Sequence, residues 1–270
     1  MLFRSLSLSG KTALVTGGSK GIGAAAALSL SEARARVAIC SRNAEELRQT
    51  AANIEARTGH RVIAIPADVS LQADVDRLIA ETEAALGGID ILVNNAGGVG
   101  QIGPFEEIPT DIYTSLYEAN VVSMVRLVKA VLPVMKAKKW GRIINISSEN
   151  GLQPDPDMTP YNLTKAAIIN FSKSLSKSVG SYNILVNTVS PAFIMTPLVK
   201  EMLEGIAARQ GTSPQEATQQ FLSQKRPTIE LKRAGTIEEV GAAIAFLASD
   251  AASFITGTNL RVDGGSVASI

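Results

Sequence analysis

The chain has 270 residues, of which 46% are hydrophobic, and a net charge of +1. This length allows one large core, and the near-neutral charge argues against electrostatic capture of nucleic acid or of an anionic membrane. One cysteine, Cys40, excludes an intrachain disulfide, and one histidine, His60, excludes a His-rich metal site. Residues 1–11 are too weakly basic and apolar for a signal peptide, and no stretch approaches the roughly 20 apolar residues of a membrane-spanning helix. We therefore expect one cytoplasmic domain over residues 1–270, with no metal, nucleic-acid or membrane partner.

Short apolar segments rich in Val and Ile alternate with longer segments of helical periodicity. Several of the apolar segments, such as 13–15 and 143–146, are apolar almost throughout and do not alternate with polar residues, which is typical of strands covered on both faces. The alternation predicts an α/β fold, a doubly wound parallel sheet of about seven strands, with ligands bound beyond the carboxyl ends of the strands. The expected strands are Thr12–Thr16, Arg36–Ser41, Val62–Pro66, Ile89–Asn94, Arg142–Ser147, Asn183–Val189 and Asn259–Val262. The expected helices are Gly21–Ala33, Ala44–Arg57, Ala73–Leu86, Asn120–Ala137, Tyr161–Val179 and Ile237–Ser249.

A glycine-rich loop, Thr16–Gly23, follows the first expected strand. Its glycines allow a positive φ and a close approach of the backbone to a ligand, and the next helix offers unpaired N–H groups to a pyrophosphate. The glycine spacing differs from the common G-x-G-x-x-G motif, and an ordinary tight turn is the alternative. After the first strand of a βαβ pattern, however, the loop predicts a dinucleotide site. The loop residues expected to bind it are Gly17, Ser19, Lys20, Gly21, Ile22 and Gly23.

The end of the second expected strand bears on the choice of cofactor. An acidic residue there would bind the adenosine ribose of NAD, whereas a cation accommodates the 2′-phosphate of NADP. The strand is followed by Ser41 and Arg42 without an acid, and Lys20 lies in the nearby glycine loop. Either these cations bind a phosphate or they are only solvated. The pattern favours NADP over NAD.

Tyr161 and Lys165 are four residues apart in a segment of helical character and therefore share one helix face. A free tyrosine has a pKa near 10, and a neighbouring ammonium lowers that pKa by stabilising the phenolate. Tuning of this kind suits general acid–base catalysis near neutral pH. The pair alone is common on helix surfaces, so its meaning depends on its neighbours.

Two polar residues strengthen the catalytic interpretation. Ser148 follows the fifth expected strand, where its hydroxyl can donate a hydrogen bond to a substrate oxygen. Asn120 is expected to begin a helix and to hold a water or a backbone group beside the lysine, with a helix cap or kink as the alternative. The candidate catalytic residues are Asn120, Ser148, Tyr161 and Lys165.

The ordered motifs of the chain resemble the short-chain dehydrogenase/reductase family. The motifs are Thr16–Gly23, Asn94–Gly97, Asn120, Ser148, Tyr161–Lys165, Pro191 and Val262–Gly265. The resemblance runs from about residue 10 to residue 265. It implies that Tyr161 is the acid/base and that Lys165 lowers its pKa and binds the nicotinamide ribose. It also implies that Ser148 holds the substrate oxygen and that Asn120 supports a water-linked proton relay.

The same resemblance implies a Rossmann fold, usually a homotetramer, and further cofactor contacts. One departure is Ala192, which follows Pro191 where the family usually has glycine, so the nicotinamide-side loop is expected to sit slightly differently. The implied contacts are Asp68 and Val69 at the adenine, Asn95, Ala96 and Gly97 at the adenosine ribose, and Pro191, Ile194 and Thr196 at the nicotinamide side.

The substrate side of the sequence leaves alternatives open. Residues 193–233 are the least regular long segment and by resemblance form a substrate lid. Their apolar residues either cover a hydrophobic substrate or pack on the core or on a neighbouring subunit. The segment 149–157 is expected to form one wall of the pocket. Its polar residues could bind hydroxyls or an amide of the substrate, but plain solvation is the favoured interpretation.

The nearest subfamily by resemblance is the 3-oxoacyl-thioester reductases. Lys138, Lys139, Lys173 and Lys177 would then dock an acidic carrier, unless they form only a solvated face. Reductases of sugars, polyols, steroids and aryl ketones share the same catalytic set. A dinucleotide-binding regulator or a transferase would not need the tyrosine–lysine pair. We therefore expect an NADP(H)-dependent oxidoreductase that moves hydride between the nicotinamide and a carbonyl or secondary-alcohol carbon of a small molecule, in a homo-oligomeric protein that is a dimer or a tetramer.

Overall fold

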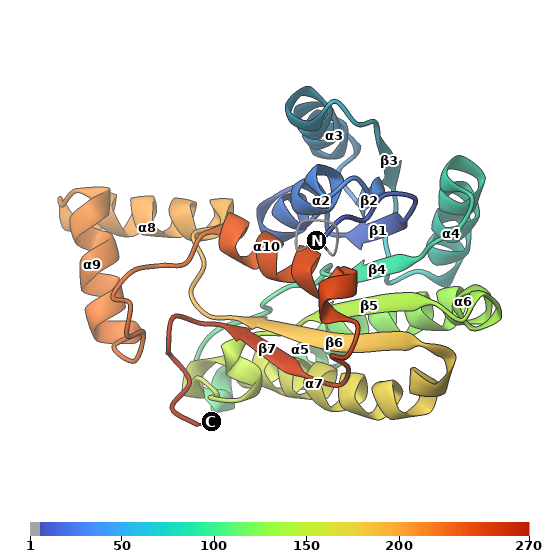
Figure 1. The fold of residues 1–270 in the computed structure, drawn as a ribbon. Coiled ribbons are helices and arrows are strands. Elements are labelled where there is room, and N and C mark those ends of the chain that lie inside the picture. The colour runs from blue at the N-terminus through green and yellow to red at the C-terminus, as the bar shows by residue number, and fades with distance from the viewer. Residues whose placement is uncertain (1–5, 270) are drawn as a thin grey trace.

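A single parallel sheet organises residues 6–269, which are the residues that the computed structural model describes (Figure 1). Within them the sheet has seven strands in the order β3-β2-β1-β4-β5-β6-β7, and every neighbouring pair is parallel. The predicted doubly wound sheet is confirmed, and the strand order reverses between β1 and β4. The strands are β1 (Thr12–Thr16), β2 (Arg36–Ser41), β3 (Val62–Pro66), β4 (Ile91–Asn94), β5 (Gly141–Ile146), β6 (Ile184–Pro191) and β7 (Asn259–Val262).

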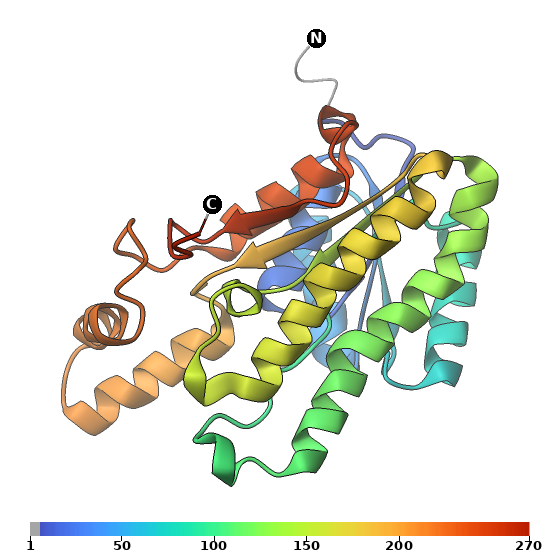
Figure 2. The same cartoon turned by 90° about the horizontal axis from the view of Figure 1, so that it is seen from below.

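Helices cover both faces of the sheet (Figures 1 and 2). Successive residues of a strand point to opposite faces, so Ala13 and Val15 of β1 belong to one hydrophobic cluster and Leu14 to the other. The first cluster takes its helical residues from α2, α3 and α10, and the second takes them from α4, α6 and α7. These helices are α2 (Gly21–Glu32), α3 (Ala44–Thr58), α4 (Gln72–Leu86), α6 (Ser123–Lys138), α7 (Thr159–Val179) and α10 (Ile237–Ala248).

Three helices were not predicted as elements: α5 (Thr110–Tyr117), α8 (Pro197–Gln210) and α9 (Pro214–Lys225). α8 and α9 start with proline in their first turn after a side-chain cap, from Thr196 and Ser213, and each buries only two residues. A weakly amphipathic segment gives little periodicity, which is why these helices read as irregular in the sequence.

The expectation that Asn120 begins a helix was wrong. Asn120 lies inside a π-helical turn, Glu118–Val122, which joins α5 directly to α6. The extra residue of a π-turn shifts the helical register. The apolar pattern of α5 is therefore out of phase with that of α6, and only the helix after the shift was predicted. Such turns are frequent at functional sites.

Buried amides tie α7 to the sheet. The Nδ2 of Asn94 donates to Oδ1 of Asn145 at 2.8 Å, and the Nδ2 of Asn145 donates to Ser172 Oγ at 2.8 Å. Ser147 Oγ donates to the carbonyl oxygen of Lys165 at 2.8 Å. Because polar groups buried in a core are costly unless they are paired, these bonds fix the position of α7 along β4 and β5.

The segment with α8 and α9 stands apart from the sheet in both views (Figures 1 and 2). It has a small hydrophobic cluster of its own, made by Phe193, Leu203, Leu222 and Ile229. Its apolar residues therefore pack mainly on one another, although Ile194 belongs to the main core and Leu198 is exposed. None of the helices in residues 6–269 has the length and apolar character needed to cross a bilayer.

Candidate active site

The glycine loop between β1 and α2 is shaped for close contact with a ligand. Gly17 and Gly21 have φ values of 64° and 58°, which favour glycine. A Cβ placed on Gly23 would lie 2.1 Å from the carbonyl oxygen of Gly17, so only glycine fits there. No side chain caps the N-terminus of α2. Its first N–H groups are thus free to bind an anion, and the loop fits the pyrophosphate of a dinucleotide.

The end of β2 lies beside this loop. The backbone N–H of Gly18 donates to Cys40 O at 2.9 Å, which places Ser41 and Arg42 next to the glycines. Arg42 is exposed. The Nζ of Lys20 lies 3.8 Å from Oε2 of Glu46, an exposed residue at the start of α3. An exposed ion pair at this distance is weak, so Glu46 neutralises Lys20 only in part.

The residues expected at the adenosine half follow β3 and β4. Asp68 accepts hydrogen bonds from Ser70 through Oδ1 in a tight turn, and Val69 is buried. Asn95 is held from behind, because its Nδ2 donates to Thr16 O at 2.9 Å and to Gly17 O at 3.1 Å. The carboxyl ends of β1, β3 and β4 therefore meet at one edge of the sheet.

The residues expected at the nicotinamide half come from the end of β6. Pro191 ends β6, and Ile194 is buried and forms a bridge with Gly235. Thr196 caps α8 and faces the glycine loop, since a Cβ on Gly21 would lie 3.6 Å from its Cγ2. This contact brings the start of the 193–233 segment against the glycine loop.

Ser148, Tyr161 and Lys165 converge at the same edge. Ser148 follows β5 and caps the short helix Glu149–Gly151. Lys165 is buried, its Nζ donates to Ile146 O at 2.9 Å and lies 5.3 Å from the centre of the Tyr161 ring. The Ser148 hydroxyl lies close enough to the Tyr161 phenol to lower the pKa of the phenol. A hydroxyl, a phenol and an amine from two elements thus surround one point at the end of β5.

Asn120 holds backbone and side-chain groups together behind this point. Its Oδ1 accepts from Gly98 N at 2.8 Å, and its Nδ2 donates to Gly98 O at 2.9 Å and to Thr164 Oγ1 at 3.0 Å. Gly97 must be small here, because a Cβ on it would lie 2.8 Å from Asn120 Oδ1. Asn120 therefore links the loop after β4 to the helix that carries Tyr161 and Lys165.

Burial sets the protonation of the two titrating residues. Burial raises the pKa of Tyr161, the nearby Ser148 hydroxyl lowers it, and the charge of Glu149 raises it. Burial also lowers the pKa of Lys165 to about 8. The sequence-based expectation was that the lysine lowers the tyrosine pKa, but in this structure burial is the largest influence and acts in the opposite direction. Tyr161 accordingly keeps its proton at neutral pH.

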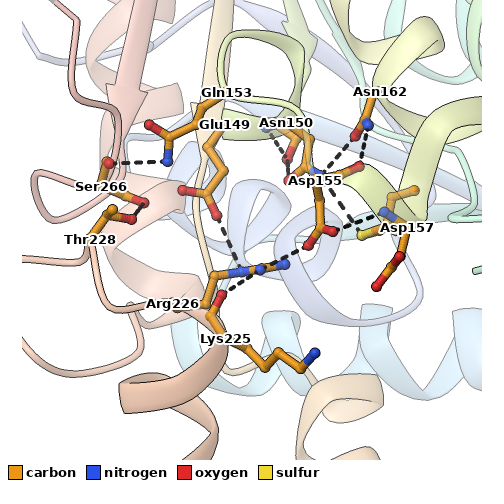
Figure 3. A network of polar contacts seen from close by, with 12 residues as sticks. Glu149, Asn150, Gln153, Asp155, Asp157, Asn162, Lys225, Arg226, Thr228 and Ser266 are labelled. Carbon is orange, nitrogen blue, oxygen red and sulfur yellow. Dashed lines mark hydrogen bonds and ion pairs between the residues drawn. The ribbon is translucent and has the colours of Figure 1, made fainter.

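Sequence reasoning missed a group of charges beside these residues. It favoured solvation for the polar residues of segment 149–157, yet Glu149 and Asn150 are buried. Arg226, at the end of α9, lies against Glu149 and Asp155 (Figure 3). Only the position of Glu149 directly after Ser148 could have drawn attention to it in the sequence.

Comparison with known proteins identifies the family of the chain. The chain matches the family model described as enoyl-(acyl carrier protein) reductase over residues 17–267. It is 38% identical to the uncharacterized oxidoreductase YvrD of Bacillus subtilis, over 98% of this chain and 99% of the relative. It is 32% identical to D-beta-hydroxybutyrate dehydrogenase of Rhizobium meliloti, over 94% of this chain and 98% of that one.

A solved structure also matches over nearly the full length of the chain. L-sorbose reductase from Gluconobacter frateurii, complexed with NADPH and L-sorbose, superposes with a TM-score of 0.92 and is 32% identical, over 98% of this chain and 100% of that chain. The chain belongs to the short-chain dehydrogenase/reductase family. It is an oxidoreductase with the Rossmann fold of that family, acts on CH–OH groups or the corresponding carbonyls, and uses a nicotinamide dinucleotide.

We expect Gly23→Ala to disturb the dinucleotide loop. The added methyl group meets the backbone of Gly17 rather than a side chain that can move away, so the variant should weaken cofactor binding and lower the free energy of unfolding by about 1–3 kcal/mol. Isothermal titration with the cofactor and denaturant unfolding measure both effects. Gly180→Ala is the matched control, because Gly180 has a φ of −58° and open space around it. Equal behaviour of the two variants would contradict the assigned role of the loop.

The pKa of Lys165 predicts a pH-dependent stability. Between pH 8 and its ordinary value of 10.5, the unfolded chain holds the proton that the folded protein releases, so this lysine makes stability rise with pH in that window. The free energy of unfolding of the wild type should rise more steeply there than that of Lys165→Met, by up to about 1.4 kcal/mol per pH unit. Below pH 8 the two slopes should agree. Parallel slopes throughout would show that Lys165 titrates normally.

Proposed function

We propose that the protein catalyses NADP(H)-dependent hydride transfer between the nicotinamide and the carbonyl or secondary-alcohol carbon of a small molecule. The convergence of Ser148, Tyr161 and Lys165 beside the glycine loop carries this proposal. The bound nicotinamide supplies the hydride chemistry, and the protein supplies orientation and electrostatics.

In the reductive direction, negative charge develops on the substrate oxygen. The hydroxyls of Ser148 and Tyr161 donate hydrogen bonds to that oxygen and stabilise the charge where it appears. Tyr161 then transfers its proton, and the raised pKa keeps that proton in place until it is needed. The Lys165 ammonium offsets the charge left on the phenolate. Asn120 keeps α7 and the loop after β4 in register, so that these groups hold their positions.

The preference for NADP rests on the end of β2. Arg42 and Lys20 provide positive charge beside the glycine loop, and the sequence has no acid between β2 and Asn43 that would bind a free ribose hydroxyl. The L-sorbose reductase that matches in structure is complexed with NADPH, and a 34% identical relative is described as the NADPH-dependent reductase BacG of Bacillus subtilis.

Small, carrier-free carbonyl compounds are the substrate class that the relatives favour. The relatives whose names state a substrate include reductases of sorbose and levodione and dehydrogenases of hydroxybutyrate. A 3-oxoacyl thioester is the second candidate, because the description of the family model names a reductase of a carrier-bound acyl chain, although of its enoyl double bond. The lysines considered for docking an acidic carrier support it less, because Lys138 is paired with Asp90 at 2.9 Å. Oxidation of NADPH measured against ketoses, keto acids, cyclic diketones and acetoacetyl thioesters separates the two classes.

Replacement of Tyr161 by Phe tests the chemistry. The variant should bind NADPH as the wild type does and lose about 10²–10⁴-fold in kcat, because a positioned acid is removed and little shape is changed. Stopped-flow measurement of NADPH oxidation gives kcat, and fluorescence titration gives cofactor affinity. Tyr182→Phe, at an exposed tyrosine in the turn before β6, is the control. An unimpaired kcat in Tyr161→Phe would refute the proposed proton donor.

Replacement of Arg42 by Ala tests the cofactor preference. Loss of a charge-assisted contact with the 2′-phosphate should lower kcat/KM with NADPH about 10- to 100-fold and leave kcat/KM with NADH nearly unchanged. Arg48→Ala, at an exposed arginine of α3 paired with Glu45, should change neither value. A wild-type protein that prefers NADH would show that the end of β2 was misinterpreted.

A further inference from the structure

The segment from Met195 to Ala234 leaves the body of the protein and returns to the same place. Ile194 and Gly235 form a parallel bridge, with Met195 N donating to Gly235 O at 2.8 Å and Gly235 N donating to Phe193 O at 2.9 Å. We call the residues between them the excursion (residues 195–234). Its ends are fixed side by side, and α8 and α9 between them are joined mainly through their own hydrophobic cluster. A unit built in this way can change its position as one body while its ends stay in place.

Arg226 ties the excursion to the segment 149–157, which follows Ser148 and which we call the catalytic loop. Its Nη1 lies 3.0 Å from Oδ2 of Asp155, and its Nε lies 3.6 Å from Oε1 of Glu149. Figure 3 shows the guanidinium between the two carboxylates. The Arg226 side chain is 20% exposed and that of Glu149 only 7%, so solvent screens this pair less than the surface pairs of the protein.

The loop that Arg226 contacts is also hydrogen-bonded to α7, the helix that carries Tyr161. Asp155 O accepts from Nδ2 of Asn162 at 2.6 Å, and Oδ1 of Asn162 accepts from Nδ2 of Asn150 at 2.9 Å. Asn162 directly follows Tyr161 in α7. A displacement of Arg226 therefore reaches the backbone next to Tyr161 through two hydrogen bonds.

The C-terminal segment contacts both the excursion and the catalytic loop. Thr228 and Ser266 share a hydrogen bond of 3.1 Å, and Nε2 of Gln153 donates to Ser266 O at 3.4 Å. These are contacts between neutral groups. Arg226 supplies positive charge at this junction. Glu149, Asp155 and Asp263 supply negative charge there.

The charge of Glu149 matters because of its place in the chain. Glu149 follows Ser148, and its negative charge raises the pKa of Tyr161. Burial raises the pKa of Glu149 itself, and Ser266 and the charge of Arg226 lower it only in part. The charged groups that face Tyr161 are Glu149 and Lys165, and those that face Glu149 are Arg226, Asp155 and Asp263. With Arg226 in place, a positive charge stands against the carboxylate. Without it, a buried carboxylate remains unpaired beside the proton donor, which is a costly arrangement.

We propose that Arg226 is a positioning residue that docks the excursion onto the catalytic loop and, by pairing with Glu149, offsets the negative charge beside Ser148 and Tyr161. Docking of the excursion is thereby coupled to proton transfer, because the positive charge that offsets Glu149 is present only when the excursion is in place. This inference rests on the proposed role of Tyr161 as the proton donor.

The test compares Arg226→Gln, Arg226→Lys, Glu149→Gln and the double variant Arg226→Gln/Glu149→Gln in the full-length protein. Alcohol oxidation needs Tyr161 as a base, so its rate rises with pH through the pKa of Tyr161. In Arg226→Gln this rise should move to higher pH by about one unit, because Glu149 is no longer offset, and the KM of the carbonyl substrate should increase about tenfold. In Glu149→Gln the rise should move to lower pH. The double variant should have a pH profile between those of the two single variants, because the two charges shift the pKa of Tyr161 in opposite directions, and Arg226→Lys should lie near the wild type.

Arg209→Gln, at an exposed arginine of α8 in the same excursion, is the control. Hydrogen exchange over residues 197–225 should be faster in Arg226→Gln than in this control, and cofactor affinity should be equal in both, which shows that the variant is folded. A pH profile of Arg226→Gln that coincides with the wild type, together with a KM within twofold of it, would overturn the inference. A double variant whose pH profile coincides with that of Arg226→Gln would do the same. A Tyr161→Phe variant that retains turnover would instead refute the proposed function, so the two failures are distinguishable.

Discussion

The site depends on the reversal of strand order between β1 and β4. Because all strands of residues 6–269 run in parallel, their carboxyl ends share one edge, and the reversal sends the connection after β1 and the connection after β4 to opposite faces. The loops that follow these strands diverge at that point. The glycine loop follows β1, and Ser148 and α7 follow β5. Residues more than a hundred positions apart are thereby brought to one place without any long irregular connection.

Buried polar groups then fix the chemistry within that crevice. Asn94, Asn145 and Ser172 set the position of α7 along the sheet, and Asn120 joins the same helix to the loop after β4. The interior of an α/β protein favours apolar side chains, so a chain of paired amides costs stability unless its geometry is complete. Here the geometry holds Lys165 in a buried position where its proton is loosely bound. The same burial that weakens the lysine as a cation strengthens the hold of Tyr161 on its proton.

The excursion follows a different physical rule from the rest of the chain. The main body is held by two large hydrophobic clusters on the faces of the sheet, whereas α8 and α9 share a small cluster and meet the catalytic loop through charges and hydrogen bonds. Hydrophobic contacts resist displacement over a wide area, while a few polar contacts can be exchanged for water. This contrast places a segment with a small hydrophobic cluster of its own beside the loop that follows Ser148.

The sequence by itself determined the sheet, because strands covered on both faces leave a continuous apolar signal and the helices between them repeat with a period of 3.6 residues. It also determined the family, since the ordered motifs need only residue identity. The helices α8 and α9 gave too weak a periodicity, α5 has only eight residues, and the π-turn at Asn120 hid a change of helical register. Only the tertiary structure decided that Glu149 is buried and that Arg226 reaches it. Charges 77 positions apart carry no mark of their pairing in sequence, because an ion pair depends on where the chain folds back and not on local pattern.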